Sequence, residues 1–273
     1  MTSATHETAL LLPACRVSHF DGWTLHTADR IPSTNPVAGK RLPAWHALRA
    51  LVQTAAYGRT GRVWTSDPGG LWLSANLPCP GERARWAILP LAAGWAVTGA
   101  LRELGLRTAG LRLRWPNDIM IGPRKLAGLL VERFTPDTAT IGIGLNLTNS
   151  PERIDAALTG ATARLCDHLP DAACDPDVVL RRILAAIRRA HAMIADPEQG
   201  FAPIAADLNA AWSDAPSHVA ITLTAALGGA TREGRFHGID ADGRLRLAFD
   251  DDPVCHFYDA TQIELLRERG SLH

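Results

Sequence analysis

The strongest candidate for chemistry in the sequence is Lys125, which directly follows the turn Gly122-Pro123-Arg124. A lysine at the end of a tight hairpin is held by a rigid backbone, so its ammonium group could neutralise charge that builds on a phosphate. The segment Trp115-Pro116-Asn117-Asp118 is expected on the partner strand. Asn117 and Asp118 could bind an adenylate hydroxyl, a magnesium-bound phosphate or the turn backbone. Alone, this pattern indicates a turn with a solvated lysine. The sequence Lys125-Leu126-Ala127-Gly128 at this distance favours a site.

A second candidate is the loop over residues 57–63, which contains Gly58, Arg59, Gly61 and Arg62. Glycines let a backbone approach a ligand closely, and arginines offer planar charged donors to phosphate or carboxylate. No Gly-Lys-Ser/Thr follows, so the loop is not a P-loop. Taken alone, the loop is better explained as a basic surface turn. Trp64, next to the loop, is more typical of a core residue than of a ligand stacker.

Ser33, Thr34 and Asn35 precede Pro36 and are typical of a helix start. Asn35 is expected to cap the helix, and Pro36 suits its first turn because the missing N–H has no partner there. The same hydroxyls and amide could satisfy a buried polar ring such as a ureido group. Gln53, on a neighbouring predicted strand, could add an amide.

Alternating glycines in Gly142-Ile143-Gly144-Leu145-Asn146 indicate a strand that something approaches closely, either a ligand or another backbone. No helix-opening glycine pattern follows, so this is not a dinucleotide fingerprint. The ten histidines lack metal-ligand spacing, and no Gly-x-Ser-x-Gly elbow is present. We therefore expect no resident metal and no covalent nucleophile.

Hydrophobic periodicity and turn residues place these motifs on strands and helices. Strands are expected at 16–20, 23–27, 47–53, 71–77, 111–115, 119–121, 126–131 and 140–147. After the short helix that ends before Pro43, helices are expected at 85–104, 151–169, 177–195 and 201–212. Beyond Pro216 only short strands are expected, at 219–223, 234–239, 245–249 and 254–258, with a hairpin at Asp242-Gly243. We expect two domains, residues 1–215 and 216–273.

Composition restricts the class of protein. The formal net charge is zero and charged residues make up 21%, so no general nucleic-acid partner is indicated. Five cysteines stand at irregular intervals without CxxC spacing, which argues against a disulfide framework and favours a reduced, cytoplasmic setting. The most apolar stretch, residues 86–101, is too short for a membrane span and indicates a buried helix.

The order of the motifs is more specific than any one of them. From Ser33 to Asn146 the chain resembles the biotin–protein ligase family, most specifically through Trp-Pro-Asn-Asp followed by Lys-Leu-Ala-Gly, and the all-β tail resembles that family's small C-terminal domain. The resemblance implies an α+β fold, with a mixed sheet backed by helices and a C-terminal SH3-like barrel. It implies that biotin and MgATP give biotinyl-5′-AMP and pyrophosphate. A lysine of a biotin carboxyl-carrier domain then attacks the anhydride and releases AMP.

The resemblance also implies roles for individual residues. Lys125 and Arg59 would be catalytic. The biotin-binding residues would be Ser33, Thr34, Asn35, Gln53, Tyr57, Gly58, Arg59, Lys125, Gly128 and Gly144. The nucleotide-binding residues would be Arg59, Arg62, Trp64, Asn117, Asp118 and Asn146. The Gly/Arg loop is expected to close over the ligand and exclude water, since the anhydride hydrolyses.

The chain departs from the family pattern at Tyr57, where an arginine is common. The repressor-type ligases have an N-terminal DNA-binding domain, and the residues before Ser33 are too few for it. We therefore expect a monofunctional ligase without DNA or membrane partners, which could form a homodimer. Two alternatives remain: a lipoate or octanoate ligase or transferase of the same fold, and a biotin- or carrier-binding module without turnover.

Overall fold

A large mixed β-sheet forms the centre of the protein, in a computed structural model that describes residues 14–108, 110–212 and 218–269. Its strand order is β1-β2-β3-β4-β8-β7-β6-β5. Only the β2–β3 pair among these neighbours is parallel. The strands are β1 (Arg16–Phe20), β2 (Trp23–Ile31), β3 (His46–Gln53), β4 (Leu71–Pro78), β5 (Leu111–Arg114), β6 (Asp118–Ile121), β7 (Arg124–Thr135) and β8 (Thr138–Leu145).

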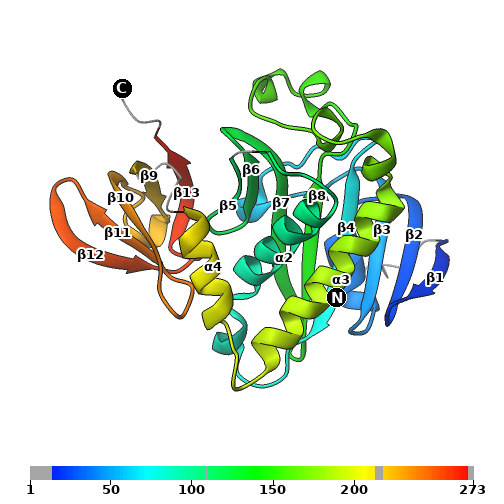
Figure 1. The fold of residues 1–273 in the computed structure, drawn as a ribbon, viewed down its shortest axis with the longest axis horizontal. Helices are drawn as coiled ribbons and strands as arrows, with labels where there is room; N and C mark the ends of the chain where they lie inside the picture. Colours follow the sequence, from blue (N-terminus) through cyan, green and yellow to red (C-terminus); the bar gives the residue numbers. More distant parts are fainter. Residues whose placement is uncertain (1–13, 109, 213–217, 270–273) are drawn as a thin grey trace, which may run out of the picture.

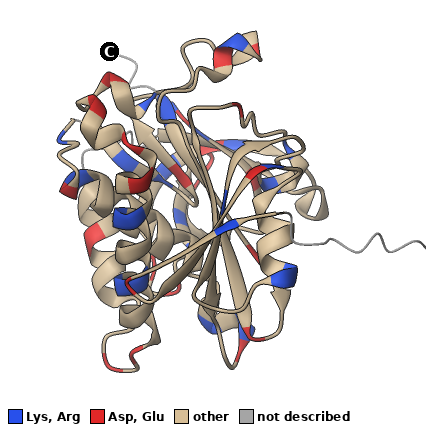
Figure 2. Cartoon of the chain, turned by 90° about the vertical axis from the view of Figure 1, so that its right-hand side faces the viewer, with Lys and Arg blue, Asp and Glu red and all other residues tan. Residues whose placement is uncertain are grey.

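Helices cover both faces of this sheet, which buries its apolar side chains on each side. The long helices α2 (Leu89–Glu103) and α3 (Pro176–Ala195) pack against each other on one face (Figure 1). The short helix α1 (Thr34–Arg41) contacts β3, β4, β7 and β8. The turned view separates the helix pair on the left from a helix on the opposite side of the strands (Figure 2). A small apolar cluster under α1, including Val37, Leu42 and Leu48, is distinct from the main core.

The C-terminal region is a five-stranded antiparallel sheet in the order β12-β11-β10-β9-β13. The strands are β9 (His218–Leu223), β10 (Thr231–Ile239), β11 (Leu245–Phe249), β12 (Asp252–Tyr258) and β13 (Ile263–Glu268). Helix α4 (Ala202–Trp212) lies between the two sheets (Figure 1). The indole of Trp212 donates to the Leu113 carbonyl at 2.5 Å, and the indole of Trp115 donates to the Gly243 carbonyl at 3.2 Å.

Most predicted elements are confirmed. The fold class is the expected α+β arrangement, with a mixed sheet, helices and a C-terminal β-sheet consistent with an SH3-like domain. Helix α3 begins at Pro176, because Asp175 caps it by accepting from the backbone N–H groups of Asp177 and Val178. Strand β13 was missed by sequence analysis. The predicted domain boundary between residues 215 and 216 lies outside the described residues.

Two predicted helices need correction. The helix expected over 85–104 begins only at Leu89, after a 3₁₀ turn at Arg83–Trp86. The segment 151–169 is not a helix but a series of 3₁₀ turns, η3 (Pro151–Arg153), η4 (Ala156–Leu158) and η5 (Leu165–Asp167). Gly160 has a φ of +73°, which interrupts a right-handed helix. Instead, Ala161 and Ala163 form backbone hydrogen bonds with Lys125 at the start of β7.

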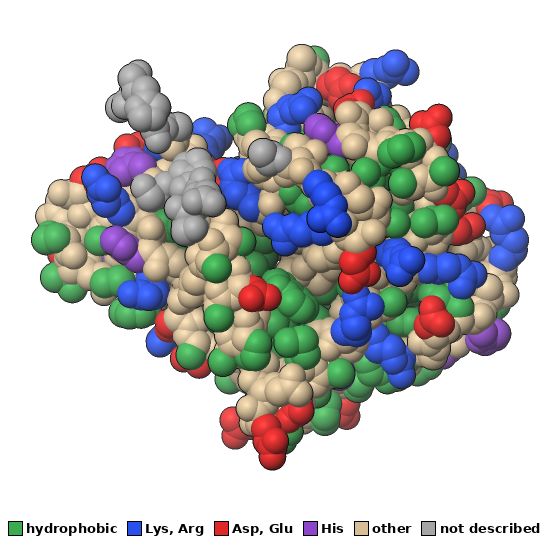
Figure 3. Space-filling view, in the orientation of Figure 1, with side chains coloured by type: hydrophobic (Ala, Val, Ile, Leu, Met, Phe, Trp, Pro, Cys, Tyr) green, Lys and Arg blue, Asp and Glu red, His purple; other side chains and the backbone are tan. Residues whose placement is uncertain are grey.

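The surface matches the balanced composition. Basic and acidic side chains are interspersed over the face seen in Figure 3. Among the described residues, no helix is long and apolar enough to span a membrane. The five cysteines, Cys15, Cys79, Cys166, Cys174 and Cys255, are free.

Candidate active site

A cavity of about 310 Å³ opens between α1, the Gly/Arg loop, the β6–β7 hairpin and strand β13. This is the lower end of the size range of small-molecule sites. All the residues predicted from the sequence to form the site line it: Ser33, Thr34, Asn35, Gln53, Tyr57, Gly58, Arg59, Arg62, Trp64, Asn117, Asp118, Lys125, Gly128, Gly144 and Asn146. The fold therefore brings together motifs more than a hundred residues apart.

Glycines form part of the cavity wall. Gly128 on β7 and Gly144 on β8 are register partners, and Asp118 on β6 is the next partner in the same row. A Cβ atom on Gly144 would lie 2.5 Å from the indole of Trp64, and a Cβ on Gly142 would overlap the side-chain oxygen of Asn35. The alternating glycines thus provide room for side chains that line the cavity, which meets the expectation of a close approach.

One end of the cavity is lined by neutral hydrogen-bonding groups, which we call the polar wall. Thr34 donates from its backbone N–H and its hydroxyl to Gln53 Oε1, at 2.7 Å and 3.1 Å. Gln53 Nε2 donates to Ser66 Oγ at 3.0 Å. Ser74 Oγ lies 2.7 Å from Thr34 Oγ1 and 2.6 Å from Asn35 Oδ1. Because these amides and hydroxyls are cross-linked, their orientations are fixed before any ligand arrives.

The predicted helix cap was wrong. Ser33 occupies the N-cap position, no side chain caps the helix, and Asn35 lies inside its first turn. The Asn35 amide donates instead to the Leu130 carbonyl at 3.2 Å and to Glu132 Oε2 at 2.8 Å. Pro36 does lie in the first turn, as predicted. The polar start of this helix is therefore directed at β4 and β7 rather than at its own backbone.

The other end of the cavity carries the charges. Lys125 Nζ lies 2.6 Å from Asp118 Oδ1, and Asp118 Oδ2 lies 2.7 Å from the guanidinium of Arg114. Lys125 Nζ also lies 4.9 Å from the ring centre of Trp64. Burial by itself would raise the pKa of Asp118, but the two cations outweigh it and the pKa is lowered. One carboxylate beside two cations leaves a net positive charge for an anionic ligand.

The Trp-Pro-Asn-Asp segment is placed differently from the prediction. Strand β5 ends at Arg114, and only Asp118 belongs to the partner strand β6, so residues 115–117 form the connection. The side chain of Asn117 donates to the Leu129 carbonyl at 2.6 Å, which ties this connection to β7. The side-chain amide of Asn146 is likewise engaged, with Ala163 and Asn149. Both asparagines line the cavity with protein partners of their own.

The sequence is similar to those of known proteins. The sequence matches the Biotin/lipoate A/B protein ligase family over residues 28–146. A biotin–[acetyl-CoA-carboxylase] ligase of Paracoccus denitrificans is 32% identical over 228 residues, covering 80% of this chain and 91% of the relative. One of Mycobacterium tuberculosis is 34% identical over 198 residues, covering 71% and 70%. The chain belongs to the biotin–protein ligase family.

A solved member of this family has the same fold. The structure of the biotin protein ligase from Aquifex aeolicus in complex with biotin and ATP matches with a TM-score of 0.72 at 23% identity. The match covers 90% of this chain and 99% of that chain. It therefore includes the C-terminal sheet as well as the central sheet.

In the present chain, the Gly/Arg loop is a small hairpin. Trp64 N–H donates to the Ala56 carbonyl at 3.0 Å and Gly58 N–H donates to the Arg62 carbonyl at 2.8 Å. Thr60 and Gly61 form its tip with φ values of +56° and +73°. Arg59 turns away from the tip and donates to the carbonyls of Ala260 and Ile263, at 2.5 Å and 2.7 Å. The C-terminal region therefore holds a residue of the loop.

Sequence analysis missed several residues of the site. Glu264, Leu265 and Leu266 of β13 line the cavity, although they are more than a hundred residues from the motifs. Arg114, Ser74 and Glu132 complete the hydrogen-bonded groups. Period-two alternation along β7 places Glu132 on the same side as Gly128, which was an available signal. No local signal marked β13, because its approach depends on domain packing.

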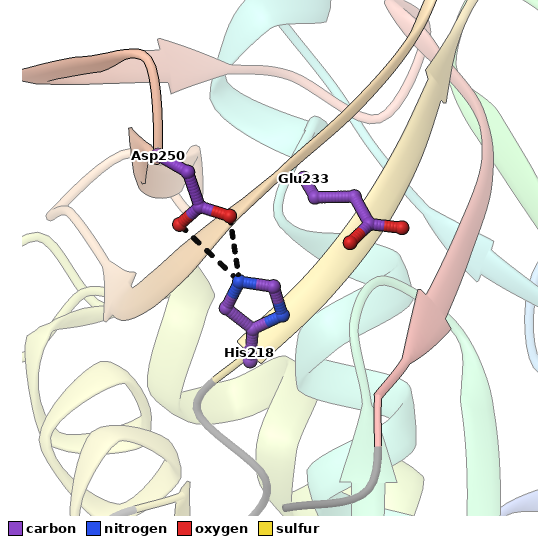
Figure 4. Close-up of side chains that lie close together, drawn as sticks. All are labelled: His218, Glu233 and Asp250. Atoms are coloured by element: carbon purple, nitrogen blue, oxygen red, sulfur yellow. Dashed lines mark hydrogen bonds and ion pairs between the residues drawn. The ribbon is translucent and has the colours of Figure 1, made fainter. Parts of the chain in front are cut away.

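A cluster of possible metal ligands lies elsewhere. His218, Glu233 and Asp250 of the C-terminal sheet have ligand atoms within 4.8 Å of one another (Figure 4). His218 Nε2 lies 2.9 Å from Asp250, and Glu233 lies 2.5 Å from Arg269. A cation there would have to displace the Arg269 guanidinium. The ion pairs account for this cluster, which sequence spacing alone did not bring together.

Proposed function

We propose that this chain joins biotin to ATP in the cavity and transfers the biotinyl group to a lysine of a biotin carboxyl-carrier domain. The observation that supports this is the two-ended cavity. The side chain of Asn35 packs next to Gly142, whereas the side chains of Lys125 and Trp64 pack next to Gly128 and Gly144. Gly142 and Gly144 are two residues apart on β8, so the two ends of the cavity are separated by about 7 Å. A ligand with a neutral polar ring at one end and a carboxylate at the other matches this arrangement.

In this proposal the polar wall binds the ureido ring. A ureido group has two N–H donors and one carbonyl acceptor. Hydroxyl and amide groups of Ser33, Thr34, Asn35 and Gln53 supply both kinds of partner. An acid with a purely apolar tail would displace water from these polar groups without offering them a hydrogen-bond partner, so it should bind poorly.

The first half-reaction needs charge stabilisation. A carboxylate oxygen of biotin attacks the α-phosphorus of ATP, the new O–P bond forms, and the bond to pyrophosphate breaks. Lys125, and Arg59 once it turns from its carbonyl partners, neutralise the negative charge on the phosphoryl oxygens. Mg²⁺ enters with ATP as part of the substrate and offsets the charge of the departing pyrophosphate.

The second half-reaction requires that the carrier lysine reaches the anhydride, and it uses no further catalytic side chain. The amine of the carrier lysine attacks the acyl carbon of the anhydride, an amide forms, and AMP leaves with the bonding electrons. The attacking amine loses a proton to water or to a nearby carboxylate. No covalent bond to the enzyme forms in either step, so the site needs no nucleophilic side chain.

The test is mass spectrometry of a biotin carboxyl-carrier domain after incubation with the protein, biotin and MgATP. We expect the carrier to gain one biotinyl group on one lysine. A carrier that stays unmodified, with no pyrophosphate exchange into ATP, would contradict the proposal and favour a binding module without turnover.

The alternative within enzymes is a lipoate or octanoate ligase, since the matched family includes both kinds. Exchange of pyrophosphate into ATP with biotin, lipoate or octanoate separates them. We expect exchange with biotin only. The cytoplasmic setting, the absence of DNA binding and the homodimer stay predictions from the sequence.

A further inference from the structure

The residue at which this chain departs from its family pattern has a specific partner. The hydroxyl of Tyr57 lies 3.0 Å and 3.2 Å from the two carboxylate oxygens of Glu132. Burial, together with the charge of Glu132 and its hydrogen bond, raises the pKa of Tyr57 to about 12. The phenol therefore keeps its proton at neutral pH and donates it to the carboxylate. Tyr57 belongs to the Gly/Arg loop, whereas Glu132 belongs to β7.

Glu132 also fixes the orientation of Asn35 in the polar wall. Its Oε2 accepts from Asn35 Nδ2 at 2.8 Å. A carboxylate only accepts hydrogen bonds, so it requires the amide of Asn35 to present its NH₂ to Glu132. The Asn35 oxygen is then directed to Ser74, at 2.6 Å. One carboxylate thus connects the Gly/Arg loop to the residues proposed to bind the ureido ring.

The loop has this contact in addition to its own hairpin bonds. Its base is closed by the Trp64–Ala56 hydrogen bond, and Arg59 is held by the C-terminal carbonyls. Tyr57 stands one residue beyond Ala56, at the point where the loop leaves the polar wall. The hydrogen bond there joins this side of the loop to β7.

We propose that Tyr57 is a positioning residue that, through Glu132, holds the Gly/Arg loop against the biotin end of the cavity. The pair is a neutral donor on a charged acceptor, which retains the loop without adding another cation to the lysine and arginines that line the cavity. This role of Tyr57 rests on the proposed function, because that function identifies biotin as the ligand. The contact between the loop and β7 can be tested without a ligand, so the first experiment does not depend on the proposed function.

The first experiment uses the ligand-free protein. Tyr57→Phe removes only the hydroxyl, and the matched control is Tyr258→Phe, which changes the chain's other tyrosine on β12. Limited trypsin digestion reports cleavage after Arg59 and Arg62. Because a hydrogen bond to a charged group is lost, we expect about tenfold faster cleavage in Tyr57→Phe, and a rate within about twofold of wild type in the control.

A second background shows whether Glu132 is the partner. In Glu132→Ala the acceptor is absent, so Tyr57→Phe should then change the cleavage rate by less than about twofold. An equal effect of Tyr57→Phe in both backgrounds, or no effect in wild type, would overturn the proposal. Thermal melting of each variant ensures that digestion is compared among folded proteins.

The kinetic experiment separates positioning from a general loss of structure. In biotin-dependent pyrophosphate exchange, Tyr57→Phe should raise the KM for biotin about tenfold while kcat and the KM for ATP stay within about twofold. A fall in kcat with unchanged KM for biotin would overturn the proposed role. Wild-type protein without exchange would instead contradict the proposed function and leave the digestion result to decide on the loop.

Discussion

Lys125 is restrained on several sides. Its ammonium contacts Asp118 and the ring of Trp64. Its backbone N–H donates to the Ala161 carbonyl at 2.8 Å, and its carbonyl accepts from Ala163 N–H at 2.9 Å. A charge fixed in this way stabilises a developing negative charge without first having to reorganise. The segment 151–169, misassigned as a helix, thus has a role in holding the lysine.

Lys125→Ala should lower the rate of adenylate formation about 100–1000-fold, the usual effect of removing one preorganised stabilising group. The matched control is Lys40→Ala, at the chain's other lysine, which is exposed near the end of α1. Pyrophosphate exchange measures both variants. Unchanged exchange in Lys125→Ala would remove this lysine from the mechanism.

Asp118 gives a pH dependence of stability. Because the pKa of its carboxyl is lowered in the folded protein, the charged form stabilises the fold above about pH 4, and this contribution is lost as the pH falls through the lower folded value. Asp118→Asn should therefore lower the free energy of unfolding by about 1–3 kcal/mol at pH 7. The difference from wild type should shrink as the pH falls below about 4. Urea titrations measure it, and a constant difference would contradict this account.

Strands β7 and β8 contribute space as well as side chains. The row that contains Gly128 and Gly144 allows the indole of Trp64 to lie against the sheet. Trp64 is half-buried and lines the cavity, so it is neither the core residue that local sequence favoured nor a freely exposed one. Its place depends on glycines that are 64 and 80 residues away in the sequence.

Gly144→Ala should displace Trp64, because the added Cβ would lie 2.5 Å from its indole. We expect the KM for biotin to rise about tenfold and the free energy of unfolding to fall by about 1–3 kcal/mol. The control is Gly99→Ala in α2, where an added Cβ meets no atom within 4 Å. Alanine there should stabilise the helix by about 0.5–1 kcal/mol. If both variants keep the wild-type KM, the glycine row does not shape the biotin site.

The two sheets form one continuous core at the scale of the whole molecule. The main apolar cluster contains residues of both sheets, such as Leu73 of the central sheet and Leu247 of the C-terminal sheet. The ion pair between Arg112 of β5 and Glu268 of β13 is buried, with 9% and 15% of the side chains exposed. This interface brings β13 to the cavity and the Ala260 and Ile263 carbonyls to Arg59.

Glu268→Ala leaves the buried Arg112 without its carboxylate and should lower the free energy of unfolding by about 3–5 kcal/mol. The control is Glu233→Ala, which breaks the half-exposed pair with Arg269 and should cost less than about 1 kcal/mol. Urea unfolding compares them. Equal losses would mean that the β5–β13 ion pair is no more important than a surface pair.

Local sequence patterns predicted most of the helices and strands and many of the residues that line the cavity. Lys125 after a hairpin, the Gly/Arg loop and the glycine strand are local patterns, because turn residues and alternation act over a few positions. Predictions failed where a distant partner decides the outcome. Asn35 does not cap its helix because Glu132 and Ser74 offer buried partners. The segment 151–169 is not a helix, and its Ala161 and Ala163 form backbone hydrogen bonds with Lys125 at the start of β7.

The pairing of these residues depends on how the distant parts of the chain pack together. It placed Asp118 against Lys125, Tyr57 against Glu132, and Arg59 against the carbonyls of a C-terminal strand and its preceding turn. Hydrogen bonds and ion pairs form within about 3–4 Å, and a sequence pattern does not specify which distant groups come that close. Local sequence patterns thus indicate which side chains are available for chemistry, whereas the packing of the two sheets sets their orientations and their charged neighbours.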